Sequence, residues 1–212
     1  MKVVIPYTPR KQQAYLHSNL DKFRYSLLCC HRRFGKSVLC ILHLIKCAMM
    51  NKHHNPRYAY IAPTYSQAKK IAWDYLKHYT EKIPGTKWNE SELRCDFING
   101  ARITLLSSEN PDSIRGIYLD GCIVDEAAMI SENLINEVIT PALSDRTGFM
   151  ILVGTPKGMN NLFYDYSKIQ KIIKEKYIKR NYQVKKKSIG DVRTYFFAPN
   201  VSWHYELLTD LY

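Results

Sequence analysis

Residues 28–37 have the sequence LCCHRRFGKS, in which an apolar run leads into Gly35-Lys36-Ser37 and an apolar helical pattern follows over 38–50. A loop of this kind between a strand and a helix binds the phosphates of a nucleotide, because its backbone N–H groups and the helix dipole both favour negative charge. The lysine reaches the outer phosphates and the serine hydroxyl binds Mg²⁺. The segment predicts a nucleoside triphosphate with Mg²⁺ as the ligand, with Lys36 and Ser37 in these two roles.

The loop departs from the usual pattern at one position. Cys30 stands where the pattern has a glycine, five residues before Gly35. A Gly-Lys-Ser triplet by itself also occurs as an ordinary helix start with a solvated lysine. The triplet therefore needs support from elsewhere in the chain.

A second segment supplies that support. Residues 121–128, GCIVDEAA, form an apolar strand-like run that ends in two acids. Residues at the carboxyl end of a buried parallel strand project into the crevice where α/β sheets bind ligands. We expect Asp125 to lie near the Mg²⁺ beside Ser37, and Glu126 to act on the attacking water as general base. A strand ending in a solvated acidic turn is the alternative, and the order of the two segments favours a shared site.

A third segment repeats the form of a strand followed by a small polar turn. Residues 149–158 read FMILVGTPKG. Thr155 would lie in the same crevice and sense the γ-phosphate. An ordinary exit from a strand explains the glycine and proline equally well.

Four segments together resemble the ATPase domain of tailed-bacteriophage terminase large subunits: residues 31–37 (HRRFGKS), 107–116 (SSENPDSIRG), 123–127 (IVDEA) and 154–158 (GTPKG). The phosphate loop of that family commonly lacks the first glycine and carries arginine. The resemblance implies an ATP-hydrolysing motor that moves double-stranded DNA into a procapsid. It implies a portal protein, a small terminase subunit and other copies of the chain in a ring as partners, and work in the host cytoplasm at the portal vertex.

The resemblance also implies roles for individual residues. Within Tyr7–Gln13, an adenine-recognising segment, Gln13 is the first choice for pairing with the base and Gln12 the second. Arg32 resembles an arginine that acts in cis, and Arg33 is the alternative for the same role. Arg115 resembles an arginine that reaches the ATP of a neighbouring subunit. An arginine suits this task because its guanidinium group neutralises the phosphoryl oxygens in the transition state. The loop residues expected to contact the nucleotide are Arg32, Arg33, Phe34, Gly35, Lys36 and Ser37.

Strands alternating with helices predict an α/β fold, a P-loop NTPase of the ASCE/RecA-like kind with a mainly parallel sheet in a three-layer sandwich. The expected strands are 25–30, 58–62, 121–124 and 149–153, and Asn99-Gly100 predicts a hairpin within 94–106. Helices are expected at 38–50, from 63–64 to about 79 with Trp73, Leu76 and Tyr79 facing the core, and from about 133 to 140, where Pro141 closes the helix.

Composition sets the remaining expectations. At 212 residues and 46% hydrophobic, the chain suits one main domain, with an ATPase core over 1–167 and a basic segment and extension over 168–212. Tyr- and Phe-rich residues after 187 are left unassigned. The tail contains no apolar strand ending in paired acids, so the nuclease domain of full-length terminases is predicted to be absent from this chain. The chain is then a fragment, or the nuclease is a separate polypeptide.

The net charge of +12 favours a polyanionic partner, and residues 168–187 carry much of the excess. Such a stretch suits sequence-independent contact with DNA phosphates. A solvated helix and loop without a partner would have the same composition. No run of about 18 apolar residues and no signal peptide occur, which predicts a soluble protein without a membrane partner. The six cysteines make no Cys-x-x-Cys pair and indicate reduced core thiols, and the adjacent His53 and His54 predict no zinc site.

Two other functions fit parts of the pattern. A helicase-like ATPase also pairs a phosphate loop with an Asp-Glu strand end, but this length leaves no room for a second lobe. A nucleotide-gated module that binds DNA or the portal with little turnover is the other alternative, and slow hydrolysis independent of DNA would favour it.

Overall fold

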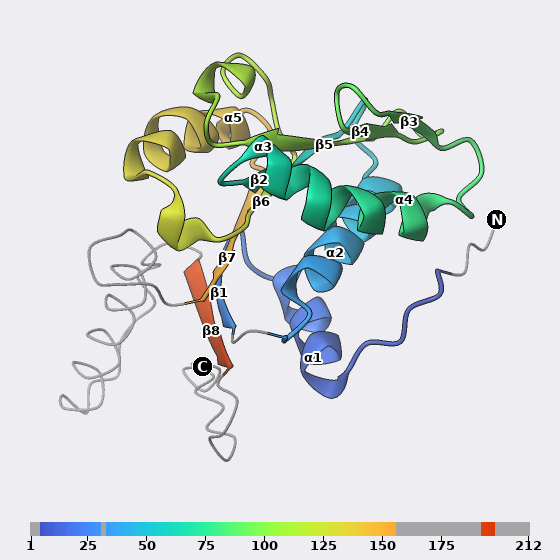
Figure 1. The fold of residues 1–212 in the computed structure, drawn as a ribbon, viewed down its shortest axis with the longest axis horizontal. Coiled ribbons are helices and arrows are strands. Elements are labelled where there is room, and N and C mark those ends of the chain that lie inside the picture. Colours follow the sequence, from blue (N-terminus) through green and yellow to red (C-terminus); the bar gives the residue numbers. More distant parts are fainter. Residues whose placement is uncertain (1–4, 31–32, 156–191, 198–212) are drawn as a thin grey trace.

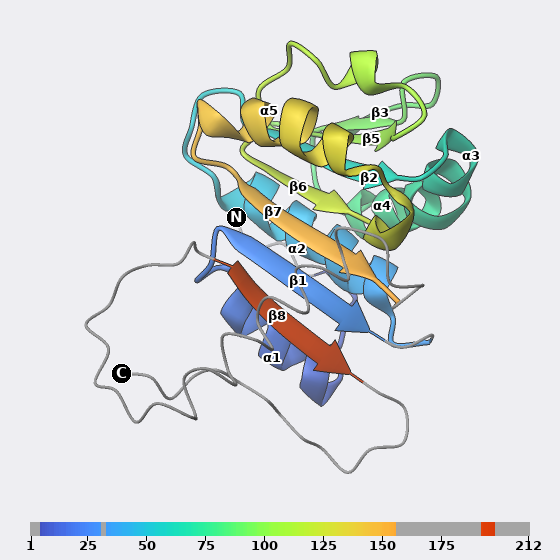
Figure 2. The ribbon, with the colours of Figure 1, turned by 90° about the vertical axis from the view of Figure 1, so that its left-hand side faces the viewer.

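The computed structural model of the protein describes residues 5–30, 33–155 and 192–197. These residues form one eight-stranded sheet with the strand order β3-β4-β5-β2-β6-β7-β1-β8. The arrows of β6, β7, β1 and β8 run side by side in one direction (Figure 2). The strands are β1 (Tyr25–Cys30), β2 (Arg57–Ala62), β3 (Lys87–Asn89), β4 (Arg94–Asp96), β5 (Arg102–Ser107), β6 (Gly121–Val124), β7 (Phe149–Gly154) and β8 (Val192–Phe197).

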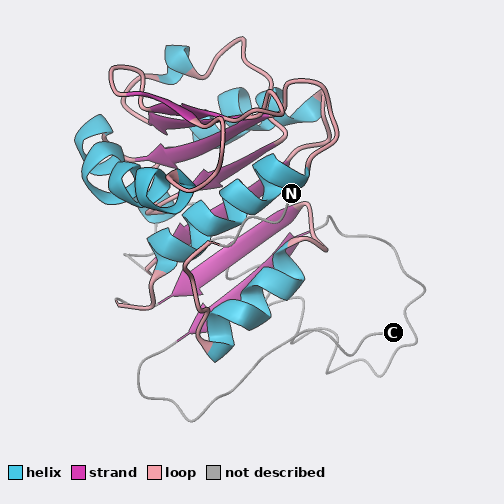
Figure 3. Cartoon of the chain, turned by 90° about the vertical axis from the view of Figure 1, so that its right-hand side faces the viewer, coloured by secondary structure: helices cyan, strands magenta, loops and turns pink. Residues whose placement is uncertain are grey.

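Helices cover both faces of this sheet (Figures 1 and 3). The α-helices are α1 (Lys11–Leu20), α2 (Lys36–Met50), α3 (Tyr65–Gln67), α4 (Asp74–Thr80) and α5 (Thr140–Ser144). Two π-helical segments, η1 (Ala68–Trp73) and η4 (Leu134–Ile139), and two 3₁₀ turns, η2 (Pro111–Ser113) and η3 (Ala127–Met129), complete them. None of the helices in the described part of the chain is long and apolar enough to cross a membrane.

The sheet separates two hydrophobic cores, because successive side chains of a strand point to opposite faces. Alternate residues of the strands, such as Leu28 and Tyr60, pack with α1, α2, η1 and α4 in one core. Their neighbours, such as Leu27 and Ile61, pack with η4 and α5 in the other. The predicted three-layer α/β sandwich with a mainly parallel sheet is confirmed.

The apolar runs predicted the parallel strands well, since strands buried on both faces read as continuous apolar segments. Strands β1 and β6 have the predicted bounds, and β2 and β7 extend one residue beyond them. The hairpin at Asn99-Gly100 is confirmed as well, because β4 and β5 pair antiparallel around it. The backbone N–H of Gly100 donates to the carbonyl of Phe97 at 3.0 Å and closes the turn.

The prediction that Pro141 closes a helix at residue 140 is wrong. The helical run continues through α5 to Ser144, and Pro141 lies in the first turn of that helix. The turn before it is a wide π turn, in which the N–H of Thr140 bonds to the carbonyl of Ile135. In an α-helix the proline ring would clash with the carbonyl four residues earlier, and the π turn relieves that clash.

The helical run over 65–80 has the predicted extent, with the π segment η1 in its middle. Trp73 and Leu76 are buried as predicted for a core stripe, while Tyr79 is only partly buried and packs against the core. The indole N–H of Trp73 donates to Glu90 at 2.6 Å. Trp73 therefore serves the core and fixes the position of Glu90.

Strand β8 lies in the stretch that the sequence left unassigned, and it pairs with β1 from Tyr25 to Cys30 in parallel. The boundary predicted at 167/168 and the basic stretch 168–187 fall outside the described residues. All six cysteines are free, as predicted, and all but Cys47 are buried.

Candidate nucleotide-binding and catalytic site

The loop after β1 turns sharply into α2 through Gly35. This residue has φ of +84°, in the left-handed region that favours glycine. A Cβ atom there would lie 2.7 Å from both Arg10 Nη2 and Gln13 Nε2. Lys36 and Ser37 follow as the first residues of α2, where backbone N–H groups have no partner within the helix. The local geometry is that of an anion-binding helix start.

Helix α1 packs against this loop through two polar side chains. The Gln13 side chain is buried, and its Nε2 donates to the carbonyls of Phe34 at 3.3 Å and Gly35 at 3.4 Å. Arg10 Nη2 donates to the same Phe34 carbonyl at 2.5 Å. The Gln13 amide oxygen accepts from the backbone N–H of Arg10 at 3.0 Å. These contacts place Gln13 at the loop, where it fixes the backbone, and recognition of adenine by Gln13 stays a prediction.

Asp125 follows the last residue of β6 and is buried. Its Oδ2 accepts a hydrogen bond from the hydroxyl of Tyr60, and its Oδ1 accepts from the N–H of Glu126 at 2.9 Å. Burial raises the pKa of the Tyr60 phenol, and the nearby Ser37 hydroxyl opposes that rise. One phenol therefore bonds to the aspartate of the distant strand and lies near the serine of the loop.

Glu126 meets the lysine of the loop directly. Lys36 Nζ lies 3.2 Å from Glu126 Oε1, and the exposed fractions of the two side chains are 12% and 35%. Glu126 has φ of +47°, a conformation that non-glycine residues seldom adopt. The structure thus brings the Lys36 loop and the acidic pair together, while their role as one nucleotide site stays a prediction.

Burial raises the pKa of Asp125 above its ordinary value, and the neighbouring Glu126 carboxylate raises it further. The hydrogen bond from Tyr60 and the charge of Lys36 oppose this shift in pKa. Asp125 is thus a carboxylate in a desolvated place with one charged neighbour of each sign. A divalent cation would stabilise its ionised form. Its oxygens and the Ser37 hydroxyl are hard donors of the kind that Mg²⁺ prefers, so these residues fit that ion.

Thr155 leaves the sheet between the two halves of this site. Strand β7 lies between β1 and β6, with Gly154 opposite Cys29. Because parallel strands end at the same edge, Thr155 emerges beside the loop on one side and the acids on the other. It is partly buried. The insertion of one strand between the loop strand and the acidic strand is the ASCE arrangement expected from the sequence.

The arginines predicted to act in catalysis are all exposed where the structure describes them. Arg115 is exposed, with 62% of its side chain accessible, and its Nη1 lies 3.0 Å from Asp112 Oδ1. It therefore faces solvent on its own subunit. Arg33 is exposed at the loop with φ of +65°. Arg32 lies outside the described residues.

Sequence reasoning missed two residues of this site, Tyr60 and Arg10. Tyr60 sits within an apolar strand and had no motif to mark it. Its signal is the alternation of β2, which puts Tyr60 on the same face as Tyr58 and Ala62, against α2. Arg10 was noted only as part of the segment Tyr7–Gln13, and only the fold shows that it reaches the loop.

Comparisons with known proteins agree with this site. The family model for the terminase large subunit, T4likevirus-type, N-terminal, matches residues 31–188. The large terminase subunit of Thermus virus P23-45 is 29% identical over 182 residues, which cover 77% of this chain and 36% of that protein. That of Escherichia phage T5 is 27% identical over 168 residues, covering 75% of this chain and 37% of the relative. The chain thus spans little more than a third of the length of these curated relatives.

Solved structures show the same fold. The large terminase ATPase domain of Thermus phage P74-26 has a TM-score of 0.64 and 28% identity, covering 76% of this chain and 70% of that one. The large terminase of a thermophilic bacteriophage, solved in complex with ADP, has a TM-score of 0.67 at 15% identity, covering 88% of this chain and 44% of that one; this second likeness shows the fold alone. Because the family model matches well over half of its residues, the chain belongs to the T4likevirus-type terminase large subunit family, of which it carries the N-terminal part.

Proposed function

We propose that this chain binds ATP with Mg²⁺ and hydrolyses it to drive double-stranded DNA into a viral procapsid. The observation that carries the proposal is the 3.2 Å contact between Lys36 and Glu126, which joins the phosphate loop to the acidic strand end. The second link through Tyr60, from Ser37 to Asp125, supports the same pocket. Similarity to ATPase domains of large terminases supports the reaction assigned to it.

The reaction uses groups of opposite charge that already lie together. Lys36 binds the β- and γ-phosphates, and Glu126 accepts a proton from the water that attacks the γ-phosphorus. The bond from the γ-phosphorus to the bridging oxygen breaks as the new P–O bond forms, leaving ADP and inorganic phosphate. Lys36 pairs with Glu126 in this structure. When the phosphates of ATP bind Lys36, this ion pair would break and Glu126 would be available to the attacking water. The base is thus coupled to the presence of substrate.

Ser37 and Asp125 would hold the Mg²⁺, with Tyr60 orienting both oxygens. The ion, when bound, neutralises charge on the phosphates. Thr155 emerges between the loop and the acids and is placed to report loss of the γ-phosphate to β7. Gln13 holds the loop and is the candidate for contact with adenine.

The positive charge that the transition state requires comes from arginine. Arg32, or Arg33 in its place, would act within the subunit. Arg115 would act on the ATP of a neighbouring subunit in a homo-oligomeric ring, and its exposure supports a role away from its own site. The portal protein, the small terminase subunit and DNA are the other partners we propose, with the work done in the host cytoplasm at the portal vertex. The net charge of +12 supports contact with DNA.

Replacing Glu126 with glutamine tests the proposal. Glu126→Gln should lower ATP turnover by two to four orders of magnitude, about the contribution of a positioned general base. ATP affinity should stay within a few-fold of wild type, because the loss is of an interaction made in the transition state. Turnover is measured with DNA and portal present, and affinity by titration of a fluorescent ATP analogue.

Glu132→Gln is the matched control. Glu132 is exposed on the same connection, and its Oε1 accepts a hydrogen bond from Asn136, away from the loop. This variant should keep wild-type turnover. Near-normal hydrolysis by Glu126→Gln would overturn the assignment of the base. Slow turnover in wild type that DNA and portal fail to stimulate would favour a nucleotide-gated binding module instead.

A further inference from the structure

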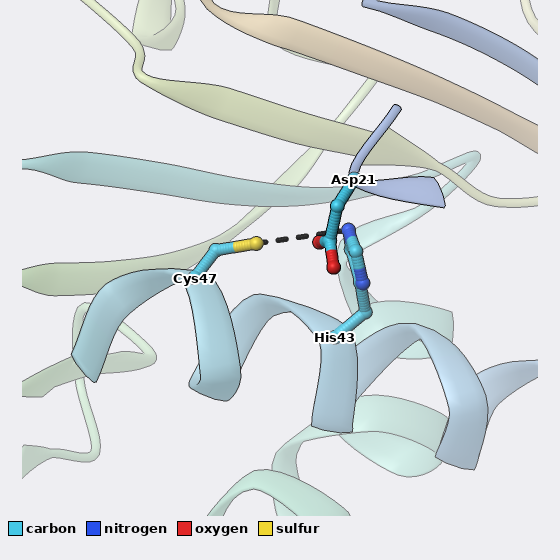
Figure 4. Close-up of side chains that lie close together, drawn as sticks. All are labelled: Asp21, His43 and Cys47. Carbon is cyan, nitrogen blue, oxygen red and sulfur yellow. Dashed lines mark hydrogen bonds between the residues drawn. The ribbon is translucent and has the colours of Figure 1, made fainter. Parts of the chain in front are cut away.

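A second cluster of polar groups lies near the start of β1, whereas the phosphate loop follows the end of that strand. Figure 4 shows its three side chains. Asp21, in the turn between α1 and β1, approaches His43 and Cys47 of α2. The three side chains each offer one donor atom, and these atoms all lie within 4.8 Å of one another. Carboxylate oxygen, imidazole nitrogen and thiolate sulfur are together the donor set of a borderline-soft transition metal ion.

The spacing within α2 suits such an ion. His43 and Cys47 are four residues apart, and side chains at this separation lie on one face of a helix. His43 Nε2 lies 3.6 Å from Cys47 Sγ. In a tetrahedral zinc site with Zn–S of about 2.3 Å and Zn–N of about 2.0–2.1 Å, these atoms lie about 3.6 Å apart. The pair is therefore set at the separation that a shared ion requires.

His43 is unusual for a buried polar residue. Its exposed fraction is 1%, and its Nδ1 has no hydrogen-bond partner within the described residues. Its other ring nitrogen, Nε2, faces Cys47 Sγ. The thiol proton would have to be displaced on binding, which costs affinity.

An ion can reach the cluster without unfolding of the protein. The three residues line a cavity of about 460 Å³, together with Asn51 and Tyr58. The Asp21 side chain is 45% exposed at its mouth. Three protein ligands and one water complete a four-coordinate site.

Lys46 is the competing group. Its ammonium contacts Asp21 Oδ2, and its side chain is 38% exposed. A partly exposed lysine can turn into solvent at low cost, because exposed ion pairs contribute little to stability. One cation would then replace another beside the same carboxylate.

We propose that Asp21, His43 and Cys47 form a binding site for Zn²⁺ or a similar transition metal ion. The ion would join the α1–β1 turn to the second half of α2. His43 lies seven residues after Lys36, about 10 Å along the helix and at its middle. The metal would therefore anchor the middle of the helix whose first turn carries Lys36 and Ser37, independently of ATP chemistry.

Titration of the metal-free, reduced chain with Co²⁺ and then Zn²⁺ tests the proposal. Wild type should show a thiolate-to-cobalt absorption band that Zn²⁺ abolishes, and one equivalent of Zn²⁺ should raise the Tm. Cys47→Ser and Asp21→Asn should weaken binding at least about tenfold, since even the loss of a supporting partner of a ligand costs 10–100-fold. Lys46→Gln should strengthen it, because this variant removes the competing cation.

Cys95→Ser is the control for the other thiols. Cys95 is buried in β4 and bonds to Thr80, away from the cluster, so its variant should bind the metal as wild type does. A wild-type chain without the band, or a band that persists in Cys47→Ser, would overturn the site. Equal affinity in wild type and Lys46→Gln would contradict the proposed exchange of cations beside Asp21.

Discussion

At the scale of single residues, the hydroxyl of Tyr60 is the contact that organises the site. It donates to Asp125 and lies near the Ser37 hydroxyl, from a side chain that is completely buried. Its bond also lowers the pKa of a carboxyl that burial raises. A residue inside an apolar strand thus holds both of the oxygen donors proposed for Mg²⁺.

Tyr60→Phe should therefore weaken the binding of Mg²⁺ at the site. Removing a hydrogen bond to a charged group costs about 1.5–3 kcal/mol, equivalent to about 10–100-fold in affinity. We expect the Mg²⁺ concentration for half-maximal ATP hydrolysis to rise by about this factor, with the fold intact because only one oxygen is lost. Tyr58→Phe is the matched control, since Tyr58 lies on the same strand face but bonds to Asn51. Identical Mg²⁺ titrations for wild type and Tyr60→Phe would rule out this role.

The sequence identified the site residues that belong to a local motif. Gly35, Lys36 and Ser37 were marked by their motif, and Asp125 and Glu126 by the abrupt end of an apolar run. Tyr60 was not identifiable, because its partners lie 23 residues before it and 65 after it in the sequence. The His43–Cys47 spacing was visible, but Asp21 joins that pair only through the turn between α1 and β1.

At the scale of elements, the parallel strands followed from composition and the connections between helical segments did not. A continuous apolar run such as 25–30 predicts a strand that is buried on both faces. The π segment at 68–73 has no local signal in the sequence. The one at 134–139 precedes Pro141, and this proline was interpreted as the end of the helix rather than as the cause of a π turn. Strand β8 was not assigned because its pairing with β1 bridges more than 160 residues of sequence.

The contact between β6 and β7 gives a prediction at this scale. Gly121 lies opposite Phe149, and a Cβ on Gly121 would come within 2.3 Å of the Phe149 ring. Gly121→Ala should lower the free energy of unfolding by about 1–3 kcal/mol, the usual cost of overpacking. Urea unfolding measures the loss. In the background of Phe149→Leu the same change should cost less, because the clashing ring is gone; equal costs in both backgrounds would show that the ring is not the cause.

At the scale of the whole molecule, the proposed nucleotide site lies where β1, β6 and β7 end, and an exposed loop that carries Arg115 follows β5. The Arg115 guanidinium pairs with the exposed Asp112 carboxylate of the same loop. Such a surface ion pair stabilises the fold little. This arrangement suits a residue that serves the site of another subunit in a ring.

Arg115→Ala should leave ATP binding by the isolated chain unchanged, because the exposed Arg115 side chain pairs with Asp112, which is not among the residues proposed to bind ATP. In the assembled motor it should reduce ATP turnover by about 10³-fold or more, the range found for arginine fingers. Arg146→Ala is the control, since Arg146 packs over Tyr118, and it should keep full turnover in the ring. Loss of nucleotide binding by the isolated Arg115→Ala chain would refute the role in trans.

The central claim is that the Lys36 loop and the Asp125–Glu126 strand end form one site around ATP and Mg²⁺. A crystal structure with Mg²⁺ and a non-hydrolysable ATP analogue tests it most directly. We predict the β- and γ-phosphates against Lys36, the ion bound by Ser37 and on the Asp125 side, and Glu126 released from Lys36 toward the γ-phosphate. An analogue bound elsewhere, or phosphates in the loop with Lys36 still paired to Glu126, would contradict the account.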